Sequence, residues 1–320
     1  MLLNPENTRN LFRHAVENHY AILAVNADSP AAIMDCLLAA ASCDAPIIVE
    51  TSLWQLTGQS FGAGDPLLGI DRYLADLDVL AGSERFRNVP IVYHTDHIKG
   101  PETLNILRYA MGAGASSISL DSSDLSEEEN ISHMSLLCDY AAEQGLPATL
   151  EMEAGVDDGV TDLAETKSLF GKVETGHPGY LALWAPGVGT KHGLEDVVGF
   201  SPDAVKAHQE AATDLAGRPI GIALHGSSGL SDEQLKAAVA AGVAKVNWSS
   251  ESLLIRSQAL REYYSTHADK LDKGHAEFKV SAMDNGAQCF VSKLYQPKVR
   301  SRIETLGGAG FGSRFVEVVG

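Results

Sequence analysis

Histidine and carboxylate side chains follow the ends of several β-rich apolar segments of the chain. His97, His192 and His225 come at or shortly after such ends, and Glu153 closes another segment. Three imidazoles and a carboxylate can bind zinc or a related divalent ion and leave an exchangeable position for a substrate. Asp96 precedes His97, and beside a metal and a reacting hydroxyl it could carry a proton. The alternative is that Asp96 orients a histidine ligand.

Two glycine-containing turns lie beside these candidate ligands, GTKHG at 189–193 and HGSSG at 225–229. Their backbone N–H groups could cradle a phosphate, as turns near the last strands of α/β barrels often do. Ser228 and Ser250 add hydroxyl donors. A glycine turn alone is often only a loop, but its place beside a metal cluster favours a phosphate site.

Eight short apolar segments must position these residues, and each is followed by polar or glycine-containing sequence. The segments span 21–26, 45–52, 89–97, 116–121, 148–153, 180–186, 219–226 and 243–248. Near-continuous apolar strands indicate burial on both faces, as in a parallel sheet. The gaps between them have helical patterns, for example 29–43, which opens with a serine cap and a proline.

Strand–helix alternation over eight units predicts a (β/α)8 TIM barrel over residues 1–266 rather than an open, doubly wound sheet. Residues 267–320 have weaker periodicity, so we expect a C-terminal helical extension packed on the barrel or on a neighbouring subunit. In such a barrel the C-terminal strand ends and the loops that follow them form the active site. This arrangement would bring the histidines and carboxylates to one mouth.

The composition excludes several classes of partner. The 320 residues include 24 Lys and Arg against 42 Asp and Glu, a formal net charge of −18. Such a charge argues against nucleic acid and against anionic membranes, and no apolar run approaches the roughly 18 residues of a membrane span. The N-terminus lacks the pattern of a secretory signal, and the 4 cysteines show no CxxC spacing. We therefore expect a cytoplasmic protein.

Five motifs together resemble a known family, the class II (metal-dependent) ketose-bisphosphate aldolases, which include fructose- and tagatose-bisphosphate aldolases. In chain order they are HTDH, LDSSDLSEEEN, LEMEAG, GTKHG and HGSSGLSDEQLKAAVAAGVAKVN. The resemblance runs from about residue 10 to 266. It implies an aldehyde-lyase of carbohydrate metabolism, as in glycolysis. Such an enzyme reversibly cleaves a ketose (bis)phosphate to dihydroxyacetone phosphate and an aldehyde through a metal-stabilised enediolate.

The resemblance also implies a cofactor, an assembly and a role for each matching residue. The cofactor is Zn²⁺ or another divalent metal, with a monovalent cation as a further candidate, and the assembly is a homodimer or homotetramer. The implied metal ligands are His97, His192, His225, Glu153 and Asp121. Asp96 would move the proton of the aldehyde-derived hydroxyl. The implied substrate- and phosphate-binding residues are Ser52, Gly193, Gly226, Ser228, Asn247, Ser249 and Ser250.

Three departures from the family pattern bear on the substrate. The loop at 156–159 is short, so Asp157, or its neighbour Asp158, takes the place of the glutamate that moves the C3 proton. Leu253 stands where a basic residue is expected, and the Asp-Pro-Arg segment that helps hold a distal phosphate has no counterpart. We therefore expect an aldehyde other than glyceraldehyde 3-phosphate, and the sequence fits either configuration at C4.

Two other functions remain open from the sequence. The short loop with Asp157 fits a non-catalytic barrel that binds an aldolase partner, although the complete ligand set disfavours it. Another metal-dependent barrel enzyme, such as a hydrolase or isomerase, is the second alternative. Hydrolases of that type usually have a His-x-His pair on the first strand, and the segment AILAVNA has none.

Overall fold

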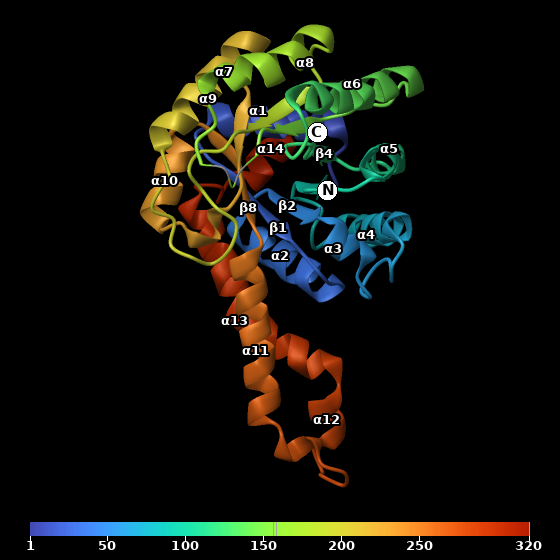
Figure 1. Ribbon diagram of the computed structural model, residues 1–320. Coiled ribbons are helices and arrows are strands. Elements are labelled where there is room, and N and C mark those ends of the chain that lie inside the picture. The colour runs from blue at the N-terminus through green and yellow to red at the C-terminus, as the bar shows by residue number, and fades with distance from the viewer. Residues whose placement is uncertain (156, 158, 320) are drawn as a thin grey trace.

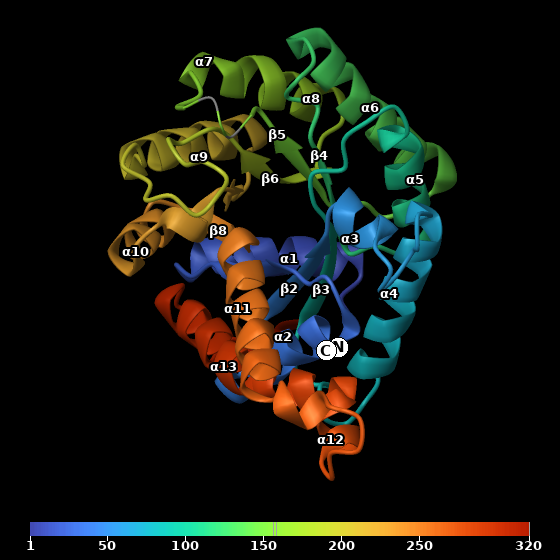
Figure 2. The same ribbon diagram turned by 60° about the horizontal axis from the view of Figure 1, so that its bottom comes forward.

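Eight parallel strands form a closed barrel in the computed structural model, which describes residues 1–155, 157 and 159–319. The strands pair in chain order, and β8 pairs with β1 to close the ring (Figure 2). The strands are β1 (Ile22–Asn26), β2 (Ile47–Thr51), β3 (Ile91–Thr95), β4 (Ser117–Leu120), β5 (Leu150–Glu153), β6 (Leu181–Ala185), β7 (Gly221–Leu224) and β8 (Val243–Trp248). Each lies within one of the predicted apolar segments, and the predicted (β/α)8 barrel is confirmed.

Every residue of the eight strands is buried, because one face of the sheet lines the barrel interior and the other packs against helices. That double burial explains the near-continuous apolar sequence. The helices are α1 (Pro5–Glu17), α2 (Pro30–Cys43), α3 (Leu53–Thr57), α4 (Pro66–Ala81), α5 (Thr103–Ala113), α6 (Glu127–Gln144), α7 (Leu163–Glu165), α8 (Gly171–Gly176), α9 (Pro202–Ala216), α10 (Asp232–Ala240), α11 (Ser250–Thr266), α12 (Phe278–Ala282), α13 (Asp284–Thr305) and α14 (Gly312–Val319).

Serine caps begin four of the outer helices. The side chains of these serines accept a hydrogen bond from the third amide of α2, α6, α9 and α10, which satisfies an amide that has no partner within the helix. Ser126 begins α6 with a capping box, so this helix starts at Glu127. Gly217 ends α9 in the left-handed conformation at φ +65°, where a glycine is favoured.

One end of the barrel interior is closed by α1. This helix packs against β6, β7 and β8, and its buried Leu11 and Phe12 join Ile22, Ile48 and Val92 in one apolar cluster. These strand residues come from the N-terminal halves of β1, β2 and β3. The opposite, C-terminal end of the barrel is therefore the one left open for a site.

The C-terminal residues form an arm and then return to the barrel. Helices α11 and α13 run side by side away from the barrel, with α12 near the far end (Figure 1). Helix α13 packs along α2 and buries a residue at every fourth position from Ala287 to Ile303. Helix α14 ends against α1 with Phe315 buried. Across the described part of the chain, no helix has the length and apolar character needed to cross a membrane.

Candidate active site

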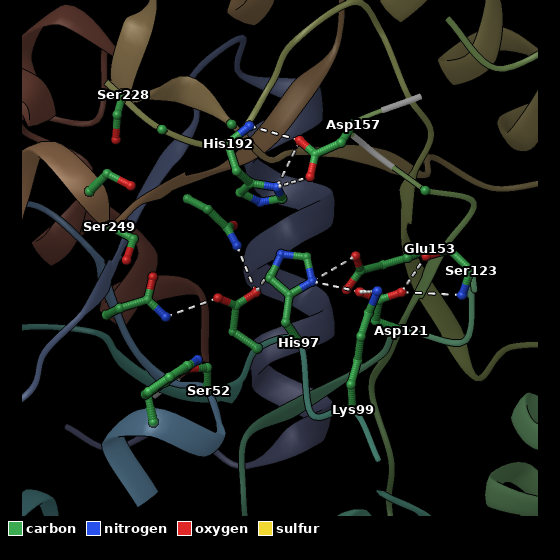
Figure 3. A pocket seen from close by; sticks show the side chains of 18 of the residues that line it. Ser52, His97, Lys99, Asp121, Ser123, Glu153, Asp157, His192, Ser228 and Ser249 are labelled. Atoms are coloured by element: carbon green, nitrogen blue, oxygen red, sulfur yellow. Dashed lines mark hydrogen bonds and ion pairs between the residues drawn. The ribbon is translucent and has the colours of Figure 1, made fainter. Parts of the chain in front are cut away.

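A cavity of about 530 Å³ opens at the C-terminal ends of the strands (Figure 3). The predicted site residues that line it are Ser52, Asp96, His97, Asp121, Glu153, Asp157, His192, Gly193, Gly226, Ser228, Asn247, Ser249 and Ser250. His225 lies just beneath, fully buried and in contact with His97. The structure thus brings all the predicted site residues together, although they come from strands and loops between Ser52 and Ser250.

The three predicted histidines form one cluster. The rings of His97 and His225 are closest, with Nε2 of His97 2.7 Å from Nδ1 of His225. The centroid of the His192 ring is 5.1 Å from that of His97. One nitrogen from each of the three rings lies within 4.8 Å of the others, which is a spacing that one ion could bridge.

Backbone geometry at the end of β3 places two consecutive side chains in the cavity. Alternation along a strand would point Asp96 and His97 to opposite faces. His97 instead adopts φ +50°, a left-handed conformation that is uncommon for a residue with a side chain. Both side chains therefore line the cavity, and Oδ1 of Asp96 is 3.6 Å from Nε2 of His97.

In each of the three imidazoles, the ring nitrogen that points away from the centre of the cluster is in contact with a carboxylate. The pairs are His97 Nδ1 with Asp121 at 2.9 Å, His225 Nε2 with Glu151 at 2.8 Å, and His192 Nδ1 with both oxygens of Asp157 at 3.0 Å. A carboxylate accepts and does not donate, so it selects the tautomer and the orientation of the ring. The second nitrogen of each ring faces the centre of the cluster, where Nδ1 of His225 is also 3.3 Å from Nδ2 of Asn247.

The close approach of His97 and His225 fits a cation between the rings. If both rings donate their outer protons to carboxylates, the two inner nitrogens carry lone pairs that face each other across 2.7 Å. Either a proton or a metal ion relieves that contact. Burial disfavours the charged form of His97, but Asp96 and Glu153 outweigh it and raise its pKa well above the usual value. The donor set of three imidazoles with Glu153 beside them fits a divalent ion such as zinc.

Asp96 is held as an ionised carboxylate by two amides. Asn26 and Asn247 each donate from Nδ2 to one of its oxygens at 2.9 Å. Burial opposes the charge, but His97 and His225 outweigh it and lower the pKa of Asp96 to about 2. In the described structure the histidines are oriented by other carboxylates, so the geometry favours the interpretation of Asp96 as a proton carrier over that of an orienting residue.

Comparison with known proteins places this chain in a family. A family model described as fructose-bisphosphate aldolase class-II matches residues 6–304. The fructose-bisphosphate aldolase of Streptococcus pyogenes serotype M1 is 30% identical over 305 residues, which cover 92% of this chain and 95% of that relative. The chain belongs to the class-II fructose-bisphosphate aldolase family. The fructose-bisphosphate aldolase of Ureaplasma parvum serovar 3 is also 30% identical, over 82% of this chain and 85% of its own.

Membership in this family confirms the resemblance found in the sequence and the predicted aldehyde-lyase activity. The class-II aldolase family is metal-dependent, in agreement with the cluster of candidate ligands. The fold also matches a solved structure, that of a fructose-bisphosphate aldolase from Campylobacter jejuni. The two structures superpose with a TM-score of 0.83 over 96% of each chain at 22% sequence identity.

Beneath the histidines of this aldolase lies a buried ionic network that the sequence analysis missed. Lys245 of β8 places Nζ 3.0 Å from Oε2 of Glu151 and 3.5 Å from Oε2 of Glu50, and all three side chains are fully buried. Burial opposes the charge on Glu151, but Lys245 and His225 outweigh it and hold its pKa well below the usual range. Burial and the charge of Asp96 raise the pKa of Glu50 well above its usual value.

One side of the cavity consists of glycine turns and a helix start. Gly226 has φ +64°, and a Cβ there would lie 2.8 Å from the backbone of Lys191, so the turn requires glycine. The first residue of α11, Ser250, lines the cavity together with Ser249, whose side chain caps no amide of that helix. Ser228 is close by and accepts from the amide of Glu251 at 3.2 Å.

The loop after β5 places Asp157 against His192. Besides the ring contact, one oxygen of Asp157 accepts from the backbone amide of His192 at 2.8 Å. The role of Asp157 in moving a C3 proton stays a prediction. Asp158, the alternative, lies outside the described residues. Across the cavity, Lys99 is paired with Asp121 at 3.0 Å and with Asp124 at 2.9 Å.

Proposed function

We propose that this enzyme reversibly cleaves a ketose phosphate between C3 and C4, giving dihydroxyacetone phosphate and an aldehyde. The single observation that carries the proposal is the cluster of His97, His192 and His225 beside the ionised carboxylate of Asp96. An aldol cleavage needs an electrophile at the C2 carbonyl and a base at the C4 hydroxyl. The site offers a candidate for each within one cavity.

The chain's own residues account for the proton movements. In cleavage, Asp96 accepts the proton of the C4 hydroxyl, the C4–O bond becomes a carbonyl, and the C3–C4 electron pair moves to the C2–C3 enediolate. A proton returned to C3 then completes dihydroxyacetone phosphate. Asp96 is suited to the first step because its carboxylate lies in the cavity beside His97 and two asparagines fix its oxygens.

The three histidines, with Glu153 beside them, are the residues that would hold the metal, whereas Asp121 contacts the outer nitrogen of His97 and would orient that ring. A divalent ion bound there would act as a Lewis acid that polarises the C2 carbonyl. Zinc is our proposal for that ion because neutral imidazoles are preferred zinc ligands. The carboxylate partners keep the imidazoles in the tautomer that binding needs.

The turns after β6 and β7 and the start of α11 are suited to the phosphate of dihydroxyacetone phosphate. Backbone amides at a helix start carry partial positive charge, and glycine turns allow an anion to approach the backbone closely. We place the phosphate among Gly193, Gly226, Ser228 and Ser250, which line the same side of the cavity. Asn247 lines the same cavity and donates to Asp96, so we place it near the reacting hydroxyl.

A lysine Schiff base is a different way to stabilise the same carbanion, and the structure disfavours it. Lys245 is the lysine inside the barrel, but it is fully buried and ion-paired with Glu151. Burial works against its charge, yet Glu151 and Glu50 outweigh it and raise its pKa above the ordinary value. A protonated, inaccessible amine does not attack a carbonyl.

A coupled assay for release of dihydroxyacetone phosphate tests the proposal. Ketose mono- and bisphosphates are offered to the enzyme before and after EDTA treatment, and again after zinc is added. We expect release that EDTA abolishes and zinc restores. The absence of release from every ketose phosphate, with zinc bound stoichiometrically, would contradict the proposed function.

A further inference from the structure

A second cavity of about 500 Å³ adjoins the site described above. Ser52, Trp54 and Ser249 line both cavities, so the two form one continuous cleft. The second cavity is further lined by Asp28 and Leu253. Its lining residues follow β1, β2 and β8, whereas the glycine turns of the first cavity follow β6 and β7. A substrate whose phosphate sits in those turns would extend its other end in this direction.

The side chain that dominates this cavity is an exposed indole. Trp54 is 85% exposed, whereas Trp184 and Trp248 are fully buried. It is presented to the cleft by the short helix α3, which packs on the barrel through Gln55 and Leu56. A flat aromatic face beside a reaction cleft is suited to the apolar C–H face of a carbon chain that carries hydroxyl groups.

The charged groups of this cleft disfavour the binding of a second phosphate. Among the described residues that line the two cavities, Lys99 is the only lysine or arginine, and its amine is already shared by Asp121 and Asp124. The second cavity contains the carboxylate of Asp28. A phosphate placed there would lie next to a like charge without a cation to offset it, which disfavours binding.

Polar groups in the same place are suited to hydroxyls. Ser52 donates from Oγ to Oε1 of Gln55 at 2.6 Å, so its oxygen lone pairs remain free to accept from a ligand. Asp28 is a second acceptor, and the hydroxyl of Ser249 caps no helix amide. Acceptors around an aromatic face are a suitable environment for a polyol and a poor one for an anion.

We propose that this second cavity is the aldehyde subsite and that it takes an uncharged, polyhydroxylated aldehyde. The enzyme would then act on ketose 1-phosphates with a single phosphate, the chain beyond C4 stacking on Trp54. This inference rests on the proposed function, since it specifies the second product of the same cleavage. The bond changes are those given above, and the aldehyde leaves as a neutral hydroxyaldehyde.

The test uses the reaction in the direction of synthesis. Dihydroxyacetone phosphate is supplied with D-glyceraldehyde, with D-erythrose, or with glyceraldehyde 3-phosphate, and kcat/KM is measured for each aldehyde with the zinc-loaded enzyme. We expect the uncharged aldehydes to exceed glyceraldehyde 3-phosphate by about tenfold or more, the scale of one unfavourable charge. A preference for glyceraldehyde 3-phosphate would overturn the inference.

Dihydroxyacetone phosphate can exchange a proton with D2O at its hydroxymethyl carbon, which becomes C3 of the ketose. This C3 exchange separates the inference from the proposed function. The exchange needs no aldehyde, and NMR detects it directly. Exchange together with a preference for the phosphorylated aldehyde would refute only the aldehyde subsite. If no exchange occurred, the proposed aldol chemistry would be wrong, and the subsite inference would be overturned with it.

Two substitutions locate the subsite. Leu253→Arg places a cation in the second cavity, and we expect it to shift the preference toward glyceraldehyde 3-phosphate by about tenfold. Leu254→Arg is the matched control on the same helix, because Leu254 is 37% exposed and lines neither cavity among those described. Equal shifts from both substitutions would contradict the assignment, since they would reflect only the change in net charge.

Trp54→Ala tests the stacking surface. We expect the KM for D-erythrose to rise about tenfold, with a smaller change for glycolaldehyde, which is too short to cover the indole. Trp54→Phe keeps an aromatic face and should restore most of the difference. Because Trp54 is almost wholly exposed, neither substitution removes buried packing. Equal effects on both aldehydes, or no rescue by phenylalanine, would overturn the role of Trp54.

Discussion

Two layers of carboxylates inside one barrel differ in how their charge is compensated. In the lower layer, Glu50 and Glu151 surround Lys245, so the chain itself provides a fixed cation. In the upper layer, Asp121 and Asp157 face imidazoles, whose other nitrogens converge on one point. The lower layer has a cation of its own in Lys245, whereas the upper layer is arranged for a cation that comes from solution.

Glu151 joins the two layers. It accepts from His225 at 2.8 Å and pairs with Lys245 at 3.0 Å, through different oxygens. The lower layer thereby fixes the tautomer of a candidate metal ligand in the upper one. We therefore expect substitutions in the lower layer to reduce both the free energy of unfolding and the metal affinity. Substitutions at the exposed rim of the upper layer should have smaller effects.

The largest effect is expected at the centre of the upper layer. His225→Ala removes a proposed metal ligand, and we expect aldolase turnover to fall by at least about a thousandfold, because Lewis-acid catalysis contributes several kcal/mol. Bound zinc should fall with it in elemental analysis. His177→Asn is the matched control, since His177 lies outside the barrel and pairs with Asp139. Full turnover in the His225 variant would show that the cluster does not hold a required metal.

The next effect concerns the lower layer. Lys245→Met leaves Glu151 buried without its cation, and we expect the free energy of unfolding to drop by about 3–5 kcal/mol in urea titrations. Adding Glu151→Gln to that variant should recover part of the loss, because the uncompensated charge is removed. If the Lys245→Met variant had the same free energy of unfolding as the parent, the network would carry no buried charge.

A moderate effect is expected at the residue that joins the layers. Glu151→Gln keeps an acceptor for His225 but removes the charge, so we expect zinc affinity to weaken by about 10- to 100-fold. Competition with a zinc chelator measures this directly. Glu143→Gln, on the exposed face of α6, is the matched control. Equal zinc affinity in the two variants would show that Glu151 does not affect metal binding and would contradict the proposed link between the layers.

The smallest effect on metal binding is expected at the rim. The side chains of Asp157 and His192 are 52% and 45% exposed, so water can replace the lost interaction in Asp157→Asn. We expect zinc affinity to change by less than about tenfold. The same variant tests the predicted proton transfer at C3, which would slow exchange of that proton by about a hundredfold. Unchanged exchange would leave Asp157 only its role of orienting His192.

Much of the barrel and of the upper layer could be predicted from the sequence. Each strand lies in an apolar segment, and the residues that follow each segment can be assigned to the mouth of the barrel from the sequence. The link between Lys245 and Glu151 could not be predicted in this way, because β8 and β5 are not neighbours in the sheet and meet only across the barrel interior. The lysine at 245, a charged residue inside the otherwise apolar strand β8, was the available signal. Trp54 gave no such signal, since exposure depends on how α3 turns.

The central claim is that the histidine cluster binds the metal on which the chemistry depends. The most direct test follows the exchange of the C3 proton of dihydroxyacetone phosphate in D2O by NMR, first with zinc-loaded enzyme and then after EDTA. We predict exchange with one zinc per chain, loss of exchange on metal removal and return with zinc. Exchange that persists without metal, together with covalent trapping of the substrate on a lysine by borohydride, would contradict the account.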